Sequence, residues 1–142
     1  MRESHLDLII NPGNARAGKI LIVDDDPDTC QLLQFLFQRK GYHTKAVTSG
    51  RQAIQQVQID TPDVVVLDIL MPDMDGWETY RRVRELSDSP VLFLSALTSG
   101  EYAAQALRMG ADDYLRKPYS NVELLARVEN ALARARSNSN RR

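Results

Sequence analysis

Short aliphatic runs, each ending at a polar residue, are the feature that most constrains the fold of this chain. Each run has the length of a strand and lacks the alternation of apolar and polar residues that marks a strand with one face in water. Strands that are apolar throughout are typical of a parallel sheet whose two faces are both covered by helices. The runs are residues 20–23, 64–67 and 91–94.

Helical patterns separate these runs. The first helix is expected to begin at Pro27 and Asp28 and to end before Gly41, because proline suits the first turn of a helix and glycine suits the position after the last turn. Two less apolar segments, 44–47 and 114–116, are predicted as further strands. Five strand–helix units in strict alternation predict a doubly wound α/β fold. The other helices are expected at residues 50–59, 77–86 and 101–109 and from about residue 120 onward.

The length of 142 residues predicts one domain, since domains usually contain roughly 100 to 200 residues. The single cysteine, Cys30, excludes a disulfide within the chain and any metal site built from several cysteines. We expect an N-terminal extension over residues 1–18, a domain over 19–136, and a polar tail or the start of a linker over 137–142.

The apolar runs also bear on location. A membrane-spanning helix needs about 20 apolar residues, and these runs are far shorter. Near the N-terminus, the apolar stretch Leu8-Ile9-Ile10 is short and lies between Asp7 and Asn11, so it lacks the pattern of a secretory signal peptide. We therefore expect a cytoplasmic protein.

The net charge of −1 conceals an uneven distribution. Residues 19–126 carry a net charge of −5, whereas residues 127–142 carry +4. An acidic body argues against a nucleic-acid-binding protein, and the arginines of the C-terminal segment are too sparse for a nucleic-acid-binding patch. The positions of the acidic residues are therefore more informative than their number.

Polar residues at the ends of the predicted strands are the strongest indication of function. Ligands of open α/β sheets bind beyond the carboxyl ends of the strands. Acidic groups that converge there would repel one another unless a cation lay among them, and carboxylate oxygens suit Mg²⁺, which often bridges to a phosphate. A lysine and a hydroxyl supply hydrogen-bond donors for phosphate oxygens. These residues are Asp24, Asp25, Asp26, Asp68, Ser95 and Lys117.

Each of these residues also has an ordinary structural interpretation. An aspartate such as Asp26 or Asp28 is most often the N-cap of the following helix. Taken alone, Ser95 would be a loop hydroxyl and Lys117 a solvated surface lysine. Their coincidence at one edge of one sheet favours a binding site over these separate interpretations.

Four motifs in the chain resemble the receiver domain of response regulators from bacterial two-component systems. The similarity extends from Lys19 to about Arg136. It implies a five-stranded parallel sheet in the flavodoxin-like order 2-1-3-4-5, with helices on both faces. The motifs are ILIVDDD at residues 20–26, VLDILMPDMDG at 66–76, SA at 95–96 and GADDYLRKP at 110–118.

The resemblance implies a role for each residue at the predicted site. Asp68 would be the phospho-acceptor, whose carboxylate attacks the phosphorus of a phosphohistidine on a sensor histidine kinase. Lys117 and Ser95 would contact the phosphoryl oxygens, because this transfer depends on positioning and neutralisation of charge. Asp25 would bind Mg²⁺ directly and Asp24 mainly through water. The implied metal ligands are Asp24, Asp25, Asp68 and the backbone carbonyl of Leu70.

The resemblance further implies a switch and a dimer. Ser95 would move toward the phosphoryl group and Tyr114 would turn inward behind it, which changes the surface formed by the last two helices and the strand between them. The C-terminal third is most similar to receivers of winged-helix transcription regulators, which form two-fold dimers through ion pairs on that surface. Ala103 stands where those receivers have a basic residue. The matching residues here are Asp112, Asp113, Glu123, Arg127 and Arg134.

The leading interpretation is therefore a regulatory phospho-accepting domain rather than an enzyme, one that promotes its own phosphorylation and dephosphorylation. It would control a linked or separate effector, for example a transcriptional one, without binding nucleic acid itself. A Mg²⁺-dependent aspartyl-phosphate phosphohydrolase is the first alternative, although such enzymes usually carry their nucleophile after the first strand rather than the third. A degenerate receiver that acts only as an interaction module is the second, and the presence of every expected site residue argues against it.

Overall fold

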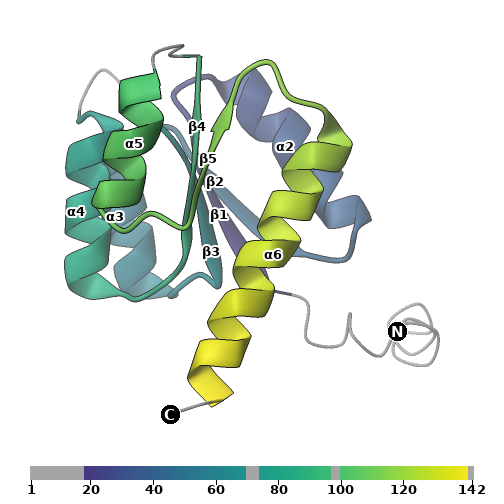
Figure 1. The fold of residues 1–142 in the computed structure, drawn as a ribbon. Coiled ribbons are helices and arrows are strands. Elements are labelled where there is room, and N and C mark those ends of the chain that lie inside the picture. The colour runs from purple at the N-terminus through teal and green to yellow at the C-terminus, as the bar shows by residue number, and fades with distance from the viewer. Residues whose placement is uncertain (1–17, 70–73, 97–99, 141–142) are drawn as a thin grey trace.

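A sheet of five parallel strands forms the centre of the structure (Figure 1). This computed structural model describes residues 18–69, 74–96 and 100–140. The strands are β1 (Lys19–Val23), β2 (His43–Val47), β3 (Val64–Asp68), β4 (Val91–Ser95) and β5 (Asp113–Arg116). They are hydrogen-bonded in the order β2-β1-β3-β4-β5, with every neighbouring pair parallel. The predicted doubly wound class and the implied strand order are both confirmed.

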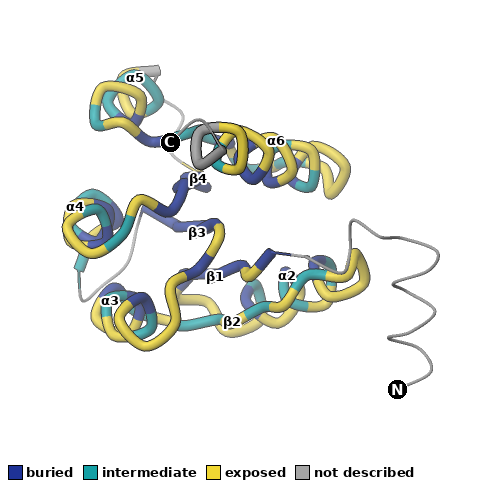
Figure 2. Tube along the Cα trace, turned by 90° about the horizontal axis from the view of Figure 1, so that it is seen from below, coloured by how far each residue is buried: buried dark blue, intermediate teal, exposed yellow. Residues whose placement is uncertain are grey.

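Helices cover both faces of this sheet. Helices α2 and α6 lie on one face, and α3, α4 and α5 lie on the other (Figures 1 and 2). Two structural layers of helix therefore enclose the strands, as expected for strands that are apolar throughout. The helices are α2 (Pro27–Arg39), α3 (Gly50–Ile59), α4 (Gly76–Leu86), α5 (Gly100–Arg108) and α6 (Asn121–Asn140).

Two apolar cores lie on opposite faces of the sheet because successive residues of a strand point in opposite directions. In β1, Ile20 and Ile22 pack in the core beneath α2 and α6. Leu21 and Val23 pack in the core beneath α3, α4 and α5. Every residue of β3 and β4 is buried, as the dark strands in Figure 2 show.

Strand β2 departs from this pattern. It forms one edge of the sheet, and its residues are exposed or half-buried. An edge strand has a neighbour on one side only, so its sequence tolerates polar residues such as His43 and Lys45. This position explains why the second strand lacks the aliphatic character of the central ones.

The ends of the helices follow the local sequence signals. The side chain of Asp26 is the N-cap of α2 and accepts a hydrogen bond from the backbone N–H of Asp28, with Pro27 in the first turn. After α2, Gly41 has a φ of +91°, a conformation that glycine adopts without steric cost. Gly110 has the same φ after α5. The predicted start of the first helix and its predicted end before Gly41 are confirmed.

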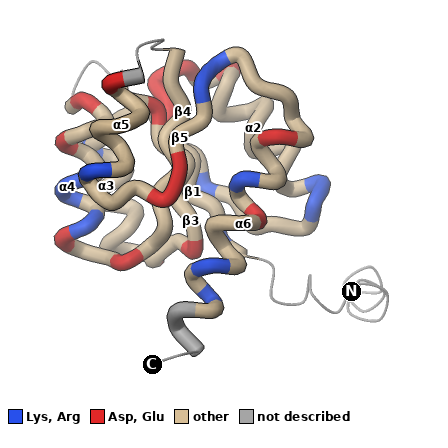
Figure 3. The backbone as a smooth tube through the Cα atoms, in the orientation of Figure 1, with Lys and Arg blue, Asp and Glu red and all other residues tan. Residues whose placement is uncertain are grey.

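Helix α6 is longer than its apolar pattern indicates. It continues to Asn140, so residues 137–140, expected in a polar tail, are helical. Alanine and arginine favour helix, and no proline or glycine interrupts residues 121–140. In Figure 3 the part of α6 that extends past the sheet carries blue, basic segments. Within the described residues, no helix combines the length and apolar character needed to cross a membrane.

The start of α4 packs tightly against the end of β3. A Cβ atom on Gly76 would press against the Cα of Ile69 and lie 2.8 Å from the backbone oxygen of Asp68. The backbone N–H of Gly76 also donates a hydrogen bond to the carbonyl of Ile69 (2.6 Å). A glycine is therefore required where the helix begins.

We predict that Gly76→Ala lowers the free energy of unfolding by about 1–3 kcal/mol, because the added methyl group must displace backbone atoms. Urea denaturation followed by circular dichroism measures this change. Arg82→Ala, an exposed substitution on the same helix, is the control and should change the free energy by no more than about 0.5 kcal/mol. Equal stability of the two variants would contradict the prediction.

Candidate functional site

The register between β1 and β3 places two aspartates side by side. Val23 of β1 pairs with Leu67 of β3, so the residues that follow them, Asp24 and Asp68, are neighbours at the carboxyl edge of the sheet. By the alternation along each strand, both side chains lie on the face covered by α2 and α6. Both aspartates are buried.

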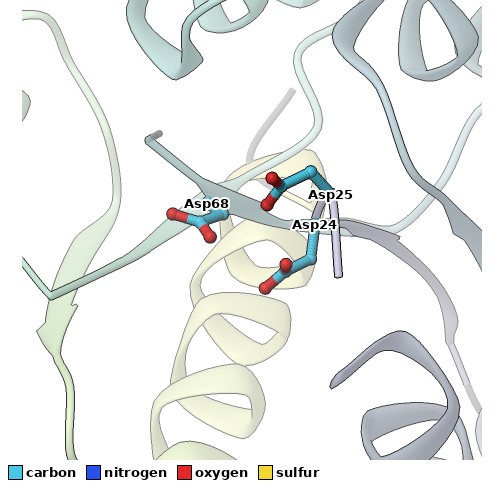
Figure 4. A group of neighbouring side chains, drawn as sticks. All are labelled: Asp24, Asp25 and Asp68. Atoms are coloured by element: carbon cyan, nitrogen blue, oxygen red, sulfur yellow. The ribbon is translucent and has the colours of Figure 1, made fainter. Parts of the chain in front are cut away.

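Asp25 joins these two residues in a cluster of carboxylates. Carboxylate oxygens of Asp24, Asp25 and Asp68 all lie within 4.8 Å of one another. Figure 4 shows the three side chains directed into the same space between the ends of β1 and β3. Asp25 is exposed, so the cluster is open to solvent on one side. Three negative charges at this separation are unfavourable without a cation among them.

Lys117 supplies positive charge beside the cluster. It follows β5, and its backbone N–H donates a hydrogen bond to the carbonyl of Ser95 (2.8 Å). Its Nζ lies 3.4 Å from Oδ2 of Asp68 and 3.6 Å from Oδ2 of Asp24. Burial alone would lower the pKa of Lys117, but the carboxylates of Asp68 and Asp24 outweigh this effect and raise it. The ammonium group is therefore charged at neutral pH. The peptide bond between Lys117 and Pro118 is cis.

One oxygen of Asp24 lacks a hydrogen bond. Its Oδ1 accepts the backbone N–H of Asp26 (2.9 Å), whereas its Oδ2 is buried with no hydrogen-bond partner among the described residues. Burial raises the pKa of Asp24, and the charge of Asp68 raises it further. A buried carboxylate oxygen without a donor, beside two further carboxylates, fits a hard divalent cation. The residues present therefore suit Mg²⁺.

Ser95 lies at the end of β4 and is fully buried. Leu94 packs beneath α2 and α6, so the alternation along β4 places the Ser95 side chain on the opposite face, covered by α4 and α5. Tyr114 of β5 lies on that same face, half-buried against the core that contains Phe93. The two residues with an implied switching role thus share a face, whereas the carboxylates and Lys117 lie toward the other.

The sequence interpretation did not anticipate that two further residues, Cys30 and Tyr119, lie at the site. The buried thiol of Cys30 donates a hydrogen bond to the backbone carbonyl of Asp24 (3.2 Å). Burial, assisted by the negative charge of Asp24, raises the pKa of Cys30 to about 11. Tyr119 is half-buried, and its burial raises the pKa of its hydroxyl while Lys117 opposes the shift. The sequence signal that could have identified Tyr119 as a site residue is its position directly after Lys117 and Pro118. Leu70, whose carbonyl was expected to bind the metal, lies outside the described residues.

Several residues of the expected dimer surface form contacts within the chain. The guanidinium of Arg127 lies 2.6 Å from Oδ1 of Asp113 and 3.8 Å from Oε2 of Glu123. Arg134 donates to the backbone carbonyl of Asp112 (3.3 Å). The carboxylate of Asp112 accepts the backbone N–H of Val91 (2.9 Å). Residues matched to ion pairs between subunits thus have partners in a single chain.

Comparison with known proteins agrees with this geometry. The response regulator receiver domain family matches residues 20–129. The receiver domain of the Francisella response regulator 1452 is 35% identical, with a TM-score of 0.78 over 83% of this chain and 98% of that one. The Vibrio cholerae chemotaxis protein CheY4 is 30% identical, with a TM-score of 0.76 over 81% of this chain and 98% of that one.

A third solved structure is the BeF3-activated N-terminal receiver domain of Klebsiella pneumoniae RstA. It is 32% identical, with a TM-score of 0.76 over 80% of this chain and 97% of that one. Most of each known domain is therefore matched by most of this chain. The chain belongs to the response regulator receiver domain family of two-component signalling systems.

Proposed function

We propose that this receiver domain accepts a phosphoryl group on Asp68 from a sensor histidine kinase, with Mg²⁺ bound at the carboxylate cluster. The observation that carries the proposal is the arrangement of three carboxylates around a buried, unsatisfied oxygen of Asp24, with the Nζ of Lys117 beside them. Receiver domains bind Mg²⁺ at an acidic cluster of this kind. Asp24 and Asp25 would hold the ion together with Asp68 and the Leu70 carbonyl.

The proposed reaction exchanges one phosphorus bond for another. A carboxylate oxygen of Asp68 attacks the phosphorus of the phosphohistidine, the bond between phosphorus and the imidazole nitrogen breaks, and an acyl phosphate forms. Lys117, already paired with Oδ2 of Asp68, provides positive charge for the incoming phosphoryl oxygens. Bound Mg²⁺ would neutralise further negative charge. Because such transfer has a loose transition state, positioning and neutralisation account for most of the catalysis.

Phosphorylation of Asp68 would cause side chains on the opposite face of the sheet to move. The modification adds a charge of about −1.5 to −2 at Asp68. The hydroxyl of Ser95, one strand away, would move toward it, and Tyr114 on the neighbouring strand would turn inward. These movements change the surface formed by α5, β5 and α6. That surface would then contact a second copy or an effector. The effector would be covalently linked or separate, for example a transcriptional one.

The family membership disfavours the alternatives. Receiver domains are regulatory phospho-acceptors, which argues against a phosphohydrolase with its own small-molecule substrate. The site residues expected from the sequence are all present, which argues against a degenerate receiver. A cytoplasmic location and self-catalysed dephosphorylation belong to the same proposal.

The proposal predicts that acetyl phosphate with Mg²⁺ adds one phosphoryl group per chain. The adduct should be labile to acid and base, should map to Asp68, and should be absent from Asp68→Asn, which removes the attacking carboxylate. Intact mass measurement detects it, and Asp75→Asn is a matched control because Asp75 caps α4 outside the cluster. Continuous release of phosphate from small esters would instead indicate a hydrolase, and Mg²⁺ binding without an adduct would indicate a degenerate receiver.

Mg²⁺ should stabilise the folded domain. Without divalent cations, Asp24→Asn should raise the free energy of unfolding by on the order of 1 kcal/mol, because it removes a buried charge beside Asp68. Mg²⁺ should raise the melting temperature of the wild-type chain, with about 2.7 kcal/mol of stabilisation at 100 times the dissociation constant. That response should be largely lost in Asp24→Asn.

Asp26→Asn is the matched control for this experiment. It removes one negative charge two residues away, and asparagine preserves the N-cap of α2. Its Mg²⁺ response should equal that of the wild-type chain. Equal Mg²⁺ responses in Asp24→Asn and Asp26→Asn, measured by differential scanning fluorimetry, would contradict the assignment of Asp24 as a ligand.

We also propose that the activated domain forms a homodimer through the surface of α5, β5 and α6. Arg127 would exchange its contact with Asp113 of the same chain for Asp113 of the second copy. Beryllofluoride should therefore raise the mass of the wild-type chain in analytical ultracentrifugation, and Arg127→Glu should abolish the increase. Arg81→Glu, on α4, is a charge-matched control that should leave the dimer unchanged. A monomeric wild-type chain after activation would overturn this part.

A further inference from the structure

A groove lies between α2 and α6, away from the carboxylate cluster. Its volume is about 500 Å³. The end of α2, the turn before β2 and the first half of α6 form its walls. The lining residues are Lys40, Tyr42, Val122, Leu125, Ala126 and Glu129.

The floor of this groove is apolar and incompletely covered. Val122 is 78% exposed. Tyr42 and Leu125 are half-buried, and both pack against the core beneath α2 and α6. Tyr42 also contacts the ring of Phe37 edge-on, with centroids 6.3 Å apart. Tyr42, Val122 and Leu125 therefore line one groove, where a further apolar segment could bury their exposed apolar surface.

The N-terminal extension joins the body beside this groove. The carbonyl of Gly18 accepts a hydrogen bond from the backbone N–H of His43 (3.1 Å), the residue after Tyr42. A Cβ on Gly18 would lie 3.2 Å from the side chain of Leu132, which follows Glu129 by three residues on α6. The point at which the extension leaves the body is thus adjacent to both a wall and an end of the groove.

The sequence of the extension matches the groove in reach and polarity. Residues 1–17 lie outside the described residues, and seven of them separate Ile10 from Gly18. Seven extended residues span up to about 25 Å, whereas the groove follows α6 from residue 129 to 122, about 10 Å at 1.5 Å per residue. The apolar side chains available are those of Leu6, Leu8, Ile9 and Ile10.

The charged residues that line the groove are also complementary to charges in the extension. Arg16 precedes Gly18 by two residues in the sequence, and its charge is opposite to that of Glu129, which lines the groove. Asp7, within the apolar segment, has an opposite charge to Lys40 on the α2 wall. Exposed pairs of this kind contribute little affinity individually, but they favour a segment of complementary charge over other occupants.

We propose that the segment Leu6–Ile10 of this chain packs in the groove between α2 and α6. The tether makes the contact intramolecular, and a short flexible linker supplies an effective concentration in the millimolar range, so weak apolar packing suffices to populate it. The packed segment would bury Val122, which is otherwise exposed.

Cross-linking in the full chain tests this placement. Leu8→Cys is combined with Ala126→Cys, and the pair is treated with a short bis-maleimide. The matched control combines Leu8→Cys with Ala133→Cys, which is also an exposed alanine of α6 but borders a different groove with Asp113 and Arg127. Cys30 does not interfere, because it is buried and its pKa is raised to about 11.

We expect the intramolecular cross-link at Ala126→Cys to form about tenfold faster than at Ala133→Cys, the ratio given by roughly 1.4 kcal/mol of docking. Adding Leu6→Asp and Ile10→Asp should reduce the faster rate to that of the control, because charge opposes burial in the apolar groove. Circular dichroism verifies that each variant is folded.

Three outcomes would overturn the proposal. Equal cross-linking rates at Ala126→Cys and Ala133→Cys would show that the extension is flexible and does not pack in the groove. A concentration-dependent cross-link between chains would assign the groove to a second copy. An unchanged rate after the two aspartate substitutions would exclude apolar packing. None of these measurements involves phosphorylation or Mg²⁺, so they are independent of the function proposed above.

Discussion

The in-register pairing of β1 with β3 is the constraint on which the rest of this structure depends. It places Asp24 beside Asp68 at the carboxyl edge of the sheet, where both carboxylates are buried. Like charges held this close raise the free energy of the folded state, and the single ammonium group of Lys117 offsets only part of the excess. The fold therefore maintains an unsatisfied negative charge at one point. The proposed divalent cation would relieve this excess of negative charge, and the proposed phosphoryl transfer would then occur there.

The alternation of side chains along the strands divides the site between the two faces of the sheet. The carboxylates and Lys117 lie toward α2 and α6, whereas Ser95 and Tyr114 lie toward α4 and α5. A charge added at Asp68 thus arises on one side of β3, and the residues expected to move in response, Ser95 and Tyr114, lie on the other side. The backbone hydrogen bond from Lys117 to Ser95 joins the two sides directly.

Ion pairs within the chain set a condition for assembly. Arg127 is already paired with Asp113, so a dimer that uses these residues must exchange one contact for an equivalent one rather than add a new contact. Exchanges of this kind change the free energy little, since exposed pairs contribute about 0–1 kcal/mol. Apolar contacts on the same surface must then supply most of the affinity.

Much of the fold could be predicted because the relevant signals are local. Unbroken aliphatic runs indicated the central strands, Pro27 and Gly41 marked the limits of the first helix, and the polar residues at strand ends indicated the site. Strand β2 was the least clear, because an edge strand needs little apolar character. Helix α6 was predicted too short, since its last turns extend past the sheet and carry no apolar pattern.

Local patterns in the sequence specify the succession of strands and helices along the chain, because periodicity depends on neighbouring residues. They also specify which residue types follow the strands and so gather at the carboxyl edge of the sheet. Which side-chain and backbone atoms come into contact depends on the tertiary structure. The unsatisfied Oδ2 of Asp24, the thiol of Cys30 on the Asp24 carbonyl, and the groove beside Gly18 each join segments that are distant in sequence or depend on burial. Such contacts follow from strand register and side-chain packing, which no local pattern encodes.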